Sequence, residues 1–242
     1  MKKIYALLAV GSVIVSFVAV PAGAIPVGRN NEAINYLFKD PVLTRVTAGL
    51  YTGQTEREVT LGDSPSITRT LSGNRTTGYL GLSVLSWLNV YGLVGQNTAE
   101  IEFMSEGDAE MALGFGVSVN LLNHFIREPI PMEDAFRLNL GAQYLSLESD
   151  IGYDTLAWDE ISASLTLSIV NHLDGNKNYR PESIALYIGP AFSTFRGDAI
   201  SAETEGGVIG GVEIFITDSV SLDLGFEYFD TANLRAGVNV HF

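Results

Sequence analysis

The sequence has no cysteine, and Lys39 and Lys177 are its only lysines beyond residue 3. The absence of cysteine excludes a disulfide framework and a thiolate metal site. The 14 Lys and Arg residues are outnumbered by 28 Asp and Glu residues, which gives a formal net charge of −14. An acidic balance of this size argues against a nucleic-acid partner. Beyond Val20 the chain also lacks the long apolar run that a transmembrane helix needs.

The chain is nevertheless rich in hydrophobic residues, which make up 46% of it and give a mean hydropathy of +0.20. From Val42 onward they recur with a period of two, which is typical of strands with two unlike faces. In "ISASLTLSI" every second residue is apolar, and the residues between them are Ser or Thr. We expect ten such strands, at about 43–56, 75–86, 88–103, 109–121, 134–148, 157–171, 183–196, 205–217, 219–230 and 233–242.

These runs predict an all-β protein, a closed antiparallel up-and-down transmembrane β-barrel over residues 42–242, with eight strands as the second choice to ten. The connectors "LSWLN" and "ITDSV" are tight, whereas "EVTLGDSPSITRTLSGN" is long. Because such barrels have short periplasmic turns and longer outer loops, we expect residue 42 and Phe242 at the periplasmic end. Two periplasmic connectors, "NHFIREPIPME" and "NHLDGNKNYRPE", are longer than this rule prefers.

The residues before the barrel have the layout of an export signal. Lys2 and Lys3 precede an uncharged run that ends at Val20, and the small residues Ala22-Gly23-Ala24 follow. We expect residues 1–24 to be a signal peptide, with an uncleaved membrane anchor as the alternative. Residues 25–41 are then a periplasmic lead-in, in which "NNEAINYLFKDP" has the start and stop signals of a short helix.

The polar face of the strands indicates which side meets lipid. A basic side chain facing mid-bilayer costs about 2–4 kcal/mol, and six charged residues avoid that cost because they fall opposite the Leu, Ile and Val set: Arg45, Arg137, Glu213, Asp223, Glu227 and Arg235. The same face carries many glycines, which suit a narrow interior. Aromatic residues near strand ends are expected to form interfacial girdles: Tyr51, Trp87, Trp158, Tyr187, Phe192, Tyr228 and Phe229. Pro190 removes one ladder donor, so we expect a bulge there.

The signal peptide, the hairpin "GGVIGGVEIFITDSVSLDLGFEYF" and the closing strand "LRAGVNVHF" together resemble the small outer-membrane β-barrel proteins. This group is related to the outer-membrane protein A transmembrane domain and the opacity-type porins. The resemblance implies that Val238, Val240 and Phe242 belong to a signal recognised by the barrel-assembly machinery. It also implies outer-membrane lipid and lipopolysaccharide as surroundings.

The six charged residues define a predicted lumen charge network. Glu213 and Asp223 lie at similar distances from the turn near Asp218, so their carboxylates are expected to be close, with Arg45 and Arg137 as available partners. Glu227 and Arg235 are expected to pair across the connector near Asp230. The network is either a satisfied polar plug or the gate of a narrow pore.

Three acidic segments, 100–110, 148–160 and 198–205, contain no Lys or Arg and are expected in outer loops, where divalent cations are possible ligands. The three histidines, His124, His172 and His241, are expected at the periplasmic end as interfacial or loop residues, which argues against an enzyme. We expect no cofactor. The sequence therefore favours an outer-membrane barrel with a structural or surface-interaction role. The alternatives are a narrow, low-conductance porin and a secreted soluble barrel that binds a hydrophobic ligand.

Overall fold

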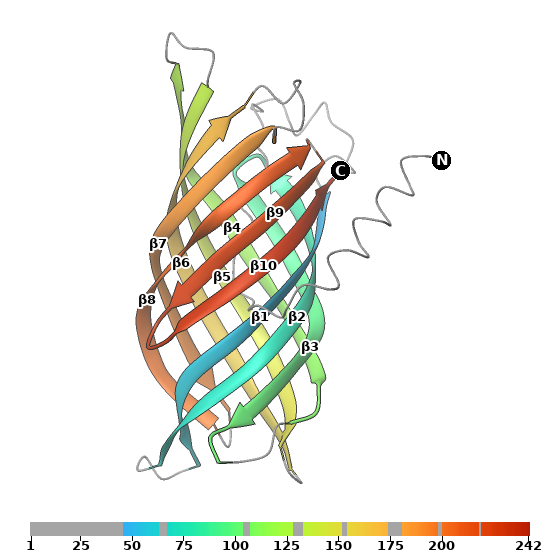
Figure 1. Ribbon diagram of the computed structural model, residues 1–242, viewed down its shortest axis with the longest axis vertical. Helices are drawn as coiled ribbons and strands as arrows, with labels where there is room; N and C mark the ends of the chain where they lie inside the picture. Colours follow the sequence, from blue (N-terminus) through green and yellow to red (C-terminus); the bar gives the residue numbers. More distant parts are fainter. Residues whose placement is uncertain are drawn as a thin grey trace, which may run out of the picture.

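The computed structural model describes residues 46–62, 67–103, 107–127, 133–151, 154–173, 181–197, 200–217 and 219–242. These residues form ten antiparallel strands that close into one barrel, in which each strand pairs with its neighbours in sequence and β1 pairs with β10 (Figure 1). The strands are β1 (Val46–Leu61), β2 (Thr68–Leu85), β3 (Leu88–Ile101), β4 (Glu110–Arg127), β5 (Glu133–Ile151), β6 (Asp154–His172), β7 (Ser183–Arg196), β8 (Ile200–Thr217), β9 (Val220–Tyr228) and β10 (Ala232–His241). The predicted all-β, ten-strand architecture is confirmed.

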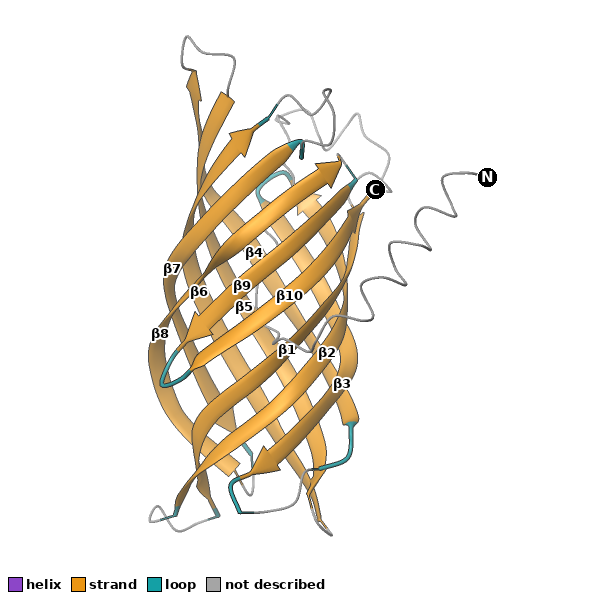
Figure 2. Ribbon diagram, viewed as in Figure 1, coloured by secondary structure: helices purple, strands orange, loops and turns teal. Residues whose placement is uncertain are grey.

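The described residues consist of strands and short connectors (Figure 2). Among them, no helix has the length and apolar character to cross a membrane. The predicted signal peptide at 1–24, the lead-in at 25–41 and Arg45 lie outside the described residues.

The two connectors expected to be tight are tight, because β3 begins three residues after β2 ends and β9 begins three residues after β8 ends. The prediction of a long loop between the first two strands is wrong. The β1–β2 ladder continues as far as the Thr60↔Thr68 pair. The reason is a change of phase: apolar residues occupy even positions at Ala48 and Leu50 but odd positions at Val59 and Leu61, and this break resembles a loop.

The bulge expected at Pro190 is also absent. Pro190 pairs with Val208 of β8, and the register between β6 and β7 is the same on either side of it. The β6–β7 ladder omits the pairs of Gly189 and Pro190 without a shift in register, because proline has no N–H to donate. The irregularity between β7 and β8 lies further along, between Ser193 and Phe195.

We call the end where β1 begins and β10 ends the terminal end of the barrel, and the opposite end the far end. Over the part of the barrel nearer the terminal end, apolar side chains face outward: Leu80, Val94, Ile188 and Leu224 have 62, 60, 57 and 52% of their surface exposed. Arg235 has the opposite parity, meaning that it occupies the alternate positions of its strand that point inward, and it is only 2% exposed. This outward apolar band and the inward charges confirm the orientation expected from the sequence.

Toward the far end both faces change character. The outward positions become polar, as at Gln54 and Glu58 of β1 and Asn74 of β2. The inward positions become largely apolar, with Arg57 as a charged exception. Eight buried apolar side chains form what we call the apolar plug: Val59, Leu71, Ile101, Leu145, Leu147, Trp158, Phe195 and Ile200. The far end is thus built like a water-soluble barrel, with an apolar core and a polar surface.

The wall loses two strands where this change occurs. The β9–β10 hairpin turns part-way along the barrel, while β1 and β8 continue beyond it (Figure 1). Past the hairpin β1 pairs directly with β8, through Thr60↔Ser201 and Leu61↔Ile200. The barrel therefore has ten strands near the terminal end and eight at the far end, where a narrower bore is filled by side chains.

Side chains of the β9–β10 hairpin bind the backbone of β1 where β1 no longer pairs with β10. The backbone N–H of Glu56 donates to Asn233 Oδ1 at 2.9 Å, and that of Glu58 donates to Asp230 Oδ2 at 2.8 Å. The Thr231 hydroxyl donates to the carbonyl oxygen of Glu56 at 2.7 Å. These side chains satisfy backbone groups of β1 that have no ladder partner where the wall changes from ten strands to eight.

Candidate functional site

The barrel interior is the candidate site, because five of the six residues of the predicted charge network lie there. Arg137, Glu213, Asp223 and Arg235 are each at most 3% exposed, and the Glu227 side chain is 15% exposed. The sixth residue, Arg45, lies outside the described part of the chain.

Glu213 and Asp223 are direct register partners on β8 and β9, so the two carboxylates share one patch of the inner wall. Each has its own partners. The Ser221 hydroxyl donates to Glu213 Oε1 at 2.7 Å, and the Tyr187 hydroxyl donates to Asp223 Oδ1 at 2.8 Å. Arg137, on β5, interacts electrostatically with Glu213. The two carboxylates are thus stabilised separately, by different polar groups.

Arg235 is the centre of a second cluster. Its Nη1 lies 3.7 Å from Glu227 Oε1, and its Nη2 lies 4.0 Å from Asp223 Oδ2. Nη2 also donates to the Tyr187 hydroxyl, and the guanidinium carbon lies 5.5 Å from the centre of that ring. One arginine therefore faces two buried carboxylates and a buried phenol. The expected proximity of Glu227 and Arg235 is present.

Two further ion pairs were not expected from the sequence. Arg75 Nη2 lies 2.9 Å from Glu160 Oε2, and Arg57 Nη1 lies 2.5 Å from Glu205 Oε2. Both arginine side chains are 2% exposed. The Arg57 guanidinium also lies over the Phe229 ring, at 4.0 Å from its centre.

These pairs correct the prediction of three acidic outer loops. Glu160 and Glu205 face the interior, and most of the described residues of segments 148–160 and 198–205 belong to strands β5, β6 and β8. Segment 100–110 is nearer the prediction, since β3 ends at Ile101 and β4 begins at Glu110. The strands extend beyond the apolar band, so the acidic composition of these segments reflects the polar outer wall of the strands in addition to loops.

The prediction that aromatic residues near strand ends form girdles on the outside is right for some residues and wrong for others. Trp87, Phe192 and Tyr228 are half exposed on the outside. Tyr51, Trp158 and Tyr187 are instead buried in the interior, at 3, 4 and 5% exposure. Their parity, which they share with the inward charges, is the signal that places them there.

The buried tyrosines carry the polar network around the inner wall. The Tyr51 hydroxyl donates to Asn239 Oδ1 at 2.6 Å, and Asn89 Nδ2 donates to the Tyr79 hydroxyl at 3.1 Å. The Tyr51 and Tyr79 rings meet edge to face, with centroids 6.0 Å apart, and the Tyr79 and Tyr91 rings lie 5.1 Å apart. The rings therefore fill the bore while their hydroxyl groups satisfy its polar lining.

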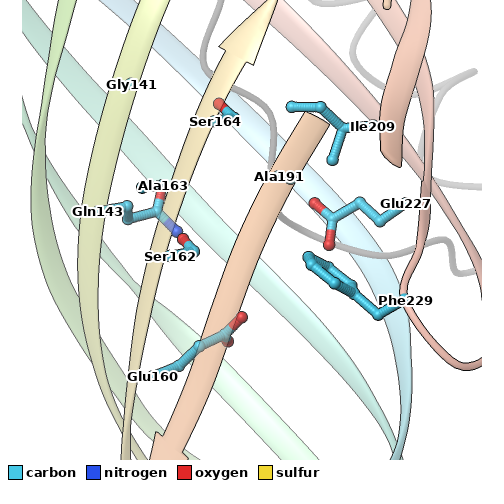
Figure 3. Close-up of a pocket in the computed structure, with 10 residues that line it drawn as sticks. All are labelled: Gly141, Gln143, Glu160, Ser162, Ala163, Ser164, Ala191, Ile209, Glu227 and Phe229. Carbon is cyan, nitrogen blue, oxygen red and sulfur yellow. The ribbon is translucent and has the colours of Figure 1, made fainter. Parts of the chain in front are cut away.

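One small cavity of the interior is lined by described residues. A cavity of about 20 Å³, room for about one water molecule, lies between β5, β6, β7, β8 and β9 (Figure 3). Glu227 and Phe229 border it on one side and Gln143 and Ser162 on the other, with Glu160 below (Figure 3). A single-water cavity is too small to serve as a conduit. Within the described ranges, no three His, Cys, Asp or Glu side chains gather as metal ligands would.

The histidines occupy three different settings. His124 is exposed on β4, and His172 lies at the last position of β6. His241 is buried, at 4% exposure, so its expected interfacial or loop position is wrong. Its Nε2 lies 3.1 Å from Ser221 Oγ and its Nδ1 lies 3.3 Å from Thr47 Oγ1. Ser221 is fully buried and donates to Glu213, so this serine–histidine contact has no access for a substrate.

The three residues of the expected assembly signal lie in one row on the outside of β10. Phe242 is 54% exposed, and Val238 and Val240 are half-buried. Asn239 and His241, which alternate with them, are buried inside. Beyond the last ladder pair, the Phe242 N–H donates to the carbonyl oxygen of Val46 at 3.0 Å, so β10 remains attached to β1 at its end.

No protein-family model matches the chain, and no curated protein matches it in sequence. Among solved structures, it is similar to Neisserial surface protein A, with a TM-score of 0.31 and 14% identity over 81% of this chain and 97% of the other. It is also similar to the translocator domain of the autotransporter NalP from Neisseria meningitidis, with a TM-score of 0.35 and 10% identity over 86% of this chain and 91% of the other.

Proposed function

We propose that this protein is an integral outer-membrane β-barrel with a structural or surface-interaction role. The observation that carries the proposal is the outward apolar band. On β6, β7, β9 and β10 it covers about nine residues, the length that a tilted strand needs to cross a bilayer. An exposed apolar surface that surrounds a barrel is otherwise a liability for a protein in water.

The change of polarity along the wall supports a particular placement. The terminal end would face the periplasm, and the far end, with its polar outside and apolar plug, would stand in water outside the cell. The charged side chains exposed there are mostly acidic, as at Glu56, Glu58 and Glu100. A partner with basic groups, or divalent cations that bridge to lipopolysaccharide, would suit such a surface.

The filled interior supports a protein that does not conduct. Three ion-paired arginines, the buried tyrosines and the apolar plug all lie in the bore. Packing of this kind argues against the alternative of a narrow porin. We also propose that the protein is not an enzyme, because its Ser221–His241 contact is buried.

The membrane placement is tested by refolding the full chain into lipid vesicles and measuring the heat-modifiable, folded form on gels. Leu224→Arg puts a cation in the middle of the apolar band and is expected to cost about 2–4 kcal/mol and to reduce insertion. Glu58→Arg, outside the band, is the matched control and should insert normally. Equal insertion of both variants, or a wild-type chain that stays soluble without lipid, would favour a secreted soluble barrel.

Conduction is tested by planar-bilayer recording of the refolded chain. The closed bore predicts no steady channels. Steady, ion-selective channels that disappear in Arg235→Ala would instead establish a narrow porin gated by the lumen charge network.

A further inference from the structure

A polar groove of about 280 Å³ lies on the barrel wall over β1, β2 and β3, beside the first residues of β10. Its lining contains two complete cross-strand rows of side chains that share the outward parity. One row is Gln54–Asn74–Thr98, and the next is Glu56–Ser72–Glu100. The sheet thus presents two amides, two hydroxyls and two carboxylates as a regular array.

The dimensions of the array follow from sheet geometry. Neighbouring strands lie about 4.8 Å apart and alternate residues on one strand about 6.6 Å apart, so the six side chains cover a patch of roughly 10 by 7 Å. A patch of this size corresponds to one or two sugar rings. Asn233 closes one end of the groove, where its amide oxygen accepts the Glu56 N–H at 2.9 Å.

The groove lies directly beyond the apolar band. On each of the three strands the first row is four positions past the last apolar or glycine residue that faces lipid, namely Leu50, Gly78 and Val94. At a rise of about 3.3 Å per residue and a tilt of about 40°, four positions correspond to roughly 10 Å along the membrane normal. The polar zone of a leaflet begins at the edge of the hydrocarbon and is about 5–8 Å thick. The first row of the groove therefore lies at the outer edge of the headgroup zone, level with sugars that extend outward beyond the phosphates.

The chemistry of the lining indicates whether the groove can bind the phosphates or the sugars of a glycolipid. No Lys or Arg lines the groove, so it offers nothing to neutralise a phosphate. Carboxylates accept hydrogen bonds from hydroxyl groups, and amides and hydroxyls both donate and accept them. This combination matches the neutral, hydroxyl-rich face of a saccharide.

We propose that the groove binds the core sugars that extend outward from the headgroup of an outer-leaflet glycolipid and thereby holds the far end of the barrel against the sugar layer. This inference rests on the proposed outer-membrane placement with the far end outside the cell. Gln54 and Asn74 are the residues expected to contact the sugar most, because both are exposed and have both donor and acceptor atoms.

The test measures binding by the refolded full chain in detergent micelles, with three probes: lipopolysaccharide that carries its core sugars, lipid A without those sugars, and the free core oligosaccharide. The double variant Gln54→Ala/Asn74→Ala is expected to bind the sugar-bearing lipid at least tenfold more weakly. The matched control is Ser146→Ala/Thr194→Ala, which removes two outward polar groups from the opposite wall and should bind like the wild type. Every variant must first show the heat-modifiable folded form.

Binding of lipid A as tightly as the sugar-bearing lipid would overturn the inference, and so would equal affinity of the groove variant, the control and the wild type. Weak binding of the free oligosaccharide that depends on Gln54 and Asn74 would support it without any membrane. Vesicle insertion is measured separately with Leu224→Arg, so a failure of the membrane placement is distinguishable from a failure of the sugar site.

Discussion

Replacement of Arg235 by alanine is the sharpest test of how the interior is stabilised. The guanidinium lies 3.7 Å from Glu227 and 4.0 Å from Asp223, and it donates to the hydroxyl of Tyr187. At an effective dielectric constant of about 20, each contact supplies roughly 4 kcal/mol of gross Coulombic attraction. The cost of burying the three charges offsets much of this gain. Arg235→Ala removes the attraction and leaves two carboxylates buried without it, so we expect a loss of about 3–5 kcal/mol.

This loss corresponds to a roughly 10²- to 10⁴-fold change in the folding equilibrium constant. The assay is urea unfolding in detergent, followed by the fluorescence of buried Trp158. Arg196→Ala, at an exposed position, is the control and should change stability by less than about 1 kcal/mol. Addition of Asp223→Asn and Glu227→Gln to the Arg235→Ala variant should recover a large part of the loss, because it removes the stranded charges.

A cost for Arg235→Ala no larger than that of Arg196→Ala would refute the reasoning. So would a triple variant that recovers nothing, since the loss would then come from packing and not from uncompensated charge.

Three other predictions concern the plug, the buried serine and the chain end. Trp158→Ala should destabilise the refolded protein by about 3–5 kcal/mol, because the indole is 4% exposed within the apolar plug. The control Phe103→Ala, at an 85% exposed position, should cost less than about 1 kcal/mol. Equal losses of stability in the two variants would contradict a dry core at the far end. A serine-directed fluorophosphonate should leave Ser221 unmodified in mass spectrometry of the folded barrel, and modification that Ser221→Ala abolishes would show that the site is accessible. Phe242→Ala should lower the amount of folded barrel in the outer membrane of cells while leaving the stability of the refolded protein nearly unchanged; an unaltered cellular amount would argue against the assembly role.

The strand period and the direction of the charges could be predicted because each depends on local alternation. Asp223 lies between two outward leucines and Arg235 between Leu234 and Ala236, and a charge on such an apolar outer face would be costly in a membrane. Their parity alone therefore indicates that they point inward. Register then follows from the tight turns, which is why the Glu213–Asp223 adjacency could be anticipated.

The buried ion-pair residues that the sequence analysis did not predict share one physical cause. The outward face of their strands changes from apolar to polar along the strand, so alternation no longer marks the inward side. Arg57 stands between Glu56 and Glu58, so its surroundings in the sequence resemble a solvated loop. Only by continuing the parity of Tyr51 past the apolar band is Arg57 placed inside. Arg75 and Glu160 were missed in the same way, because each lies where the outward face has already become polar.

The inversion of polarity has a simple origin in the solvent, given the proposed membrane placement. Burial of apolar surface stabilises a fold because it removes that surface from water. A barrel wall in hydrocarbon gains nothing from an apolar interior, so its bore is stabilised by ion pairs and hydrogen bonds, such as those of Arg235 and Tyr187. Beyond the bilayer the solvent is water again, and an apolar plug becomes the favourable filling. The short β9–β10 hairpin ends near this transition, and beyond it eight strands close tightly around Leu147 and Ile101.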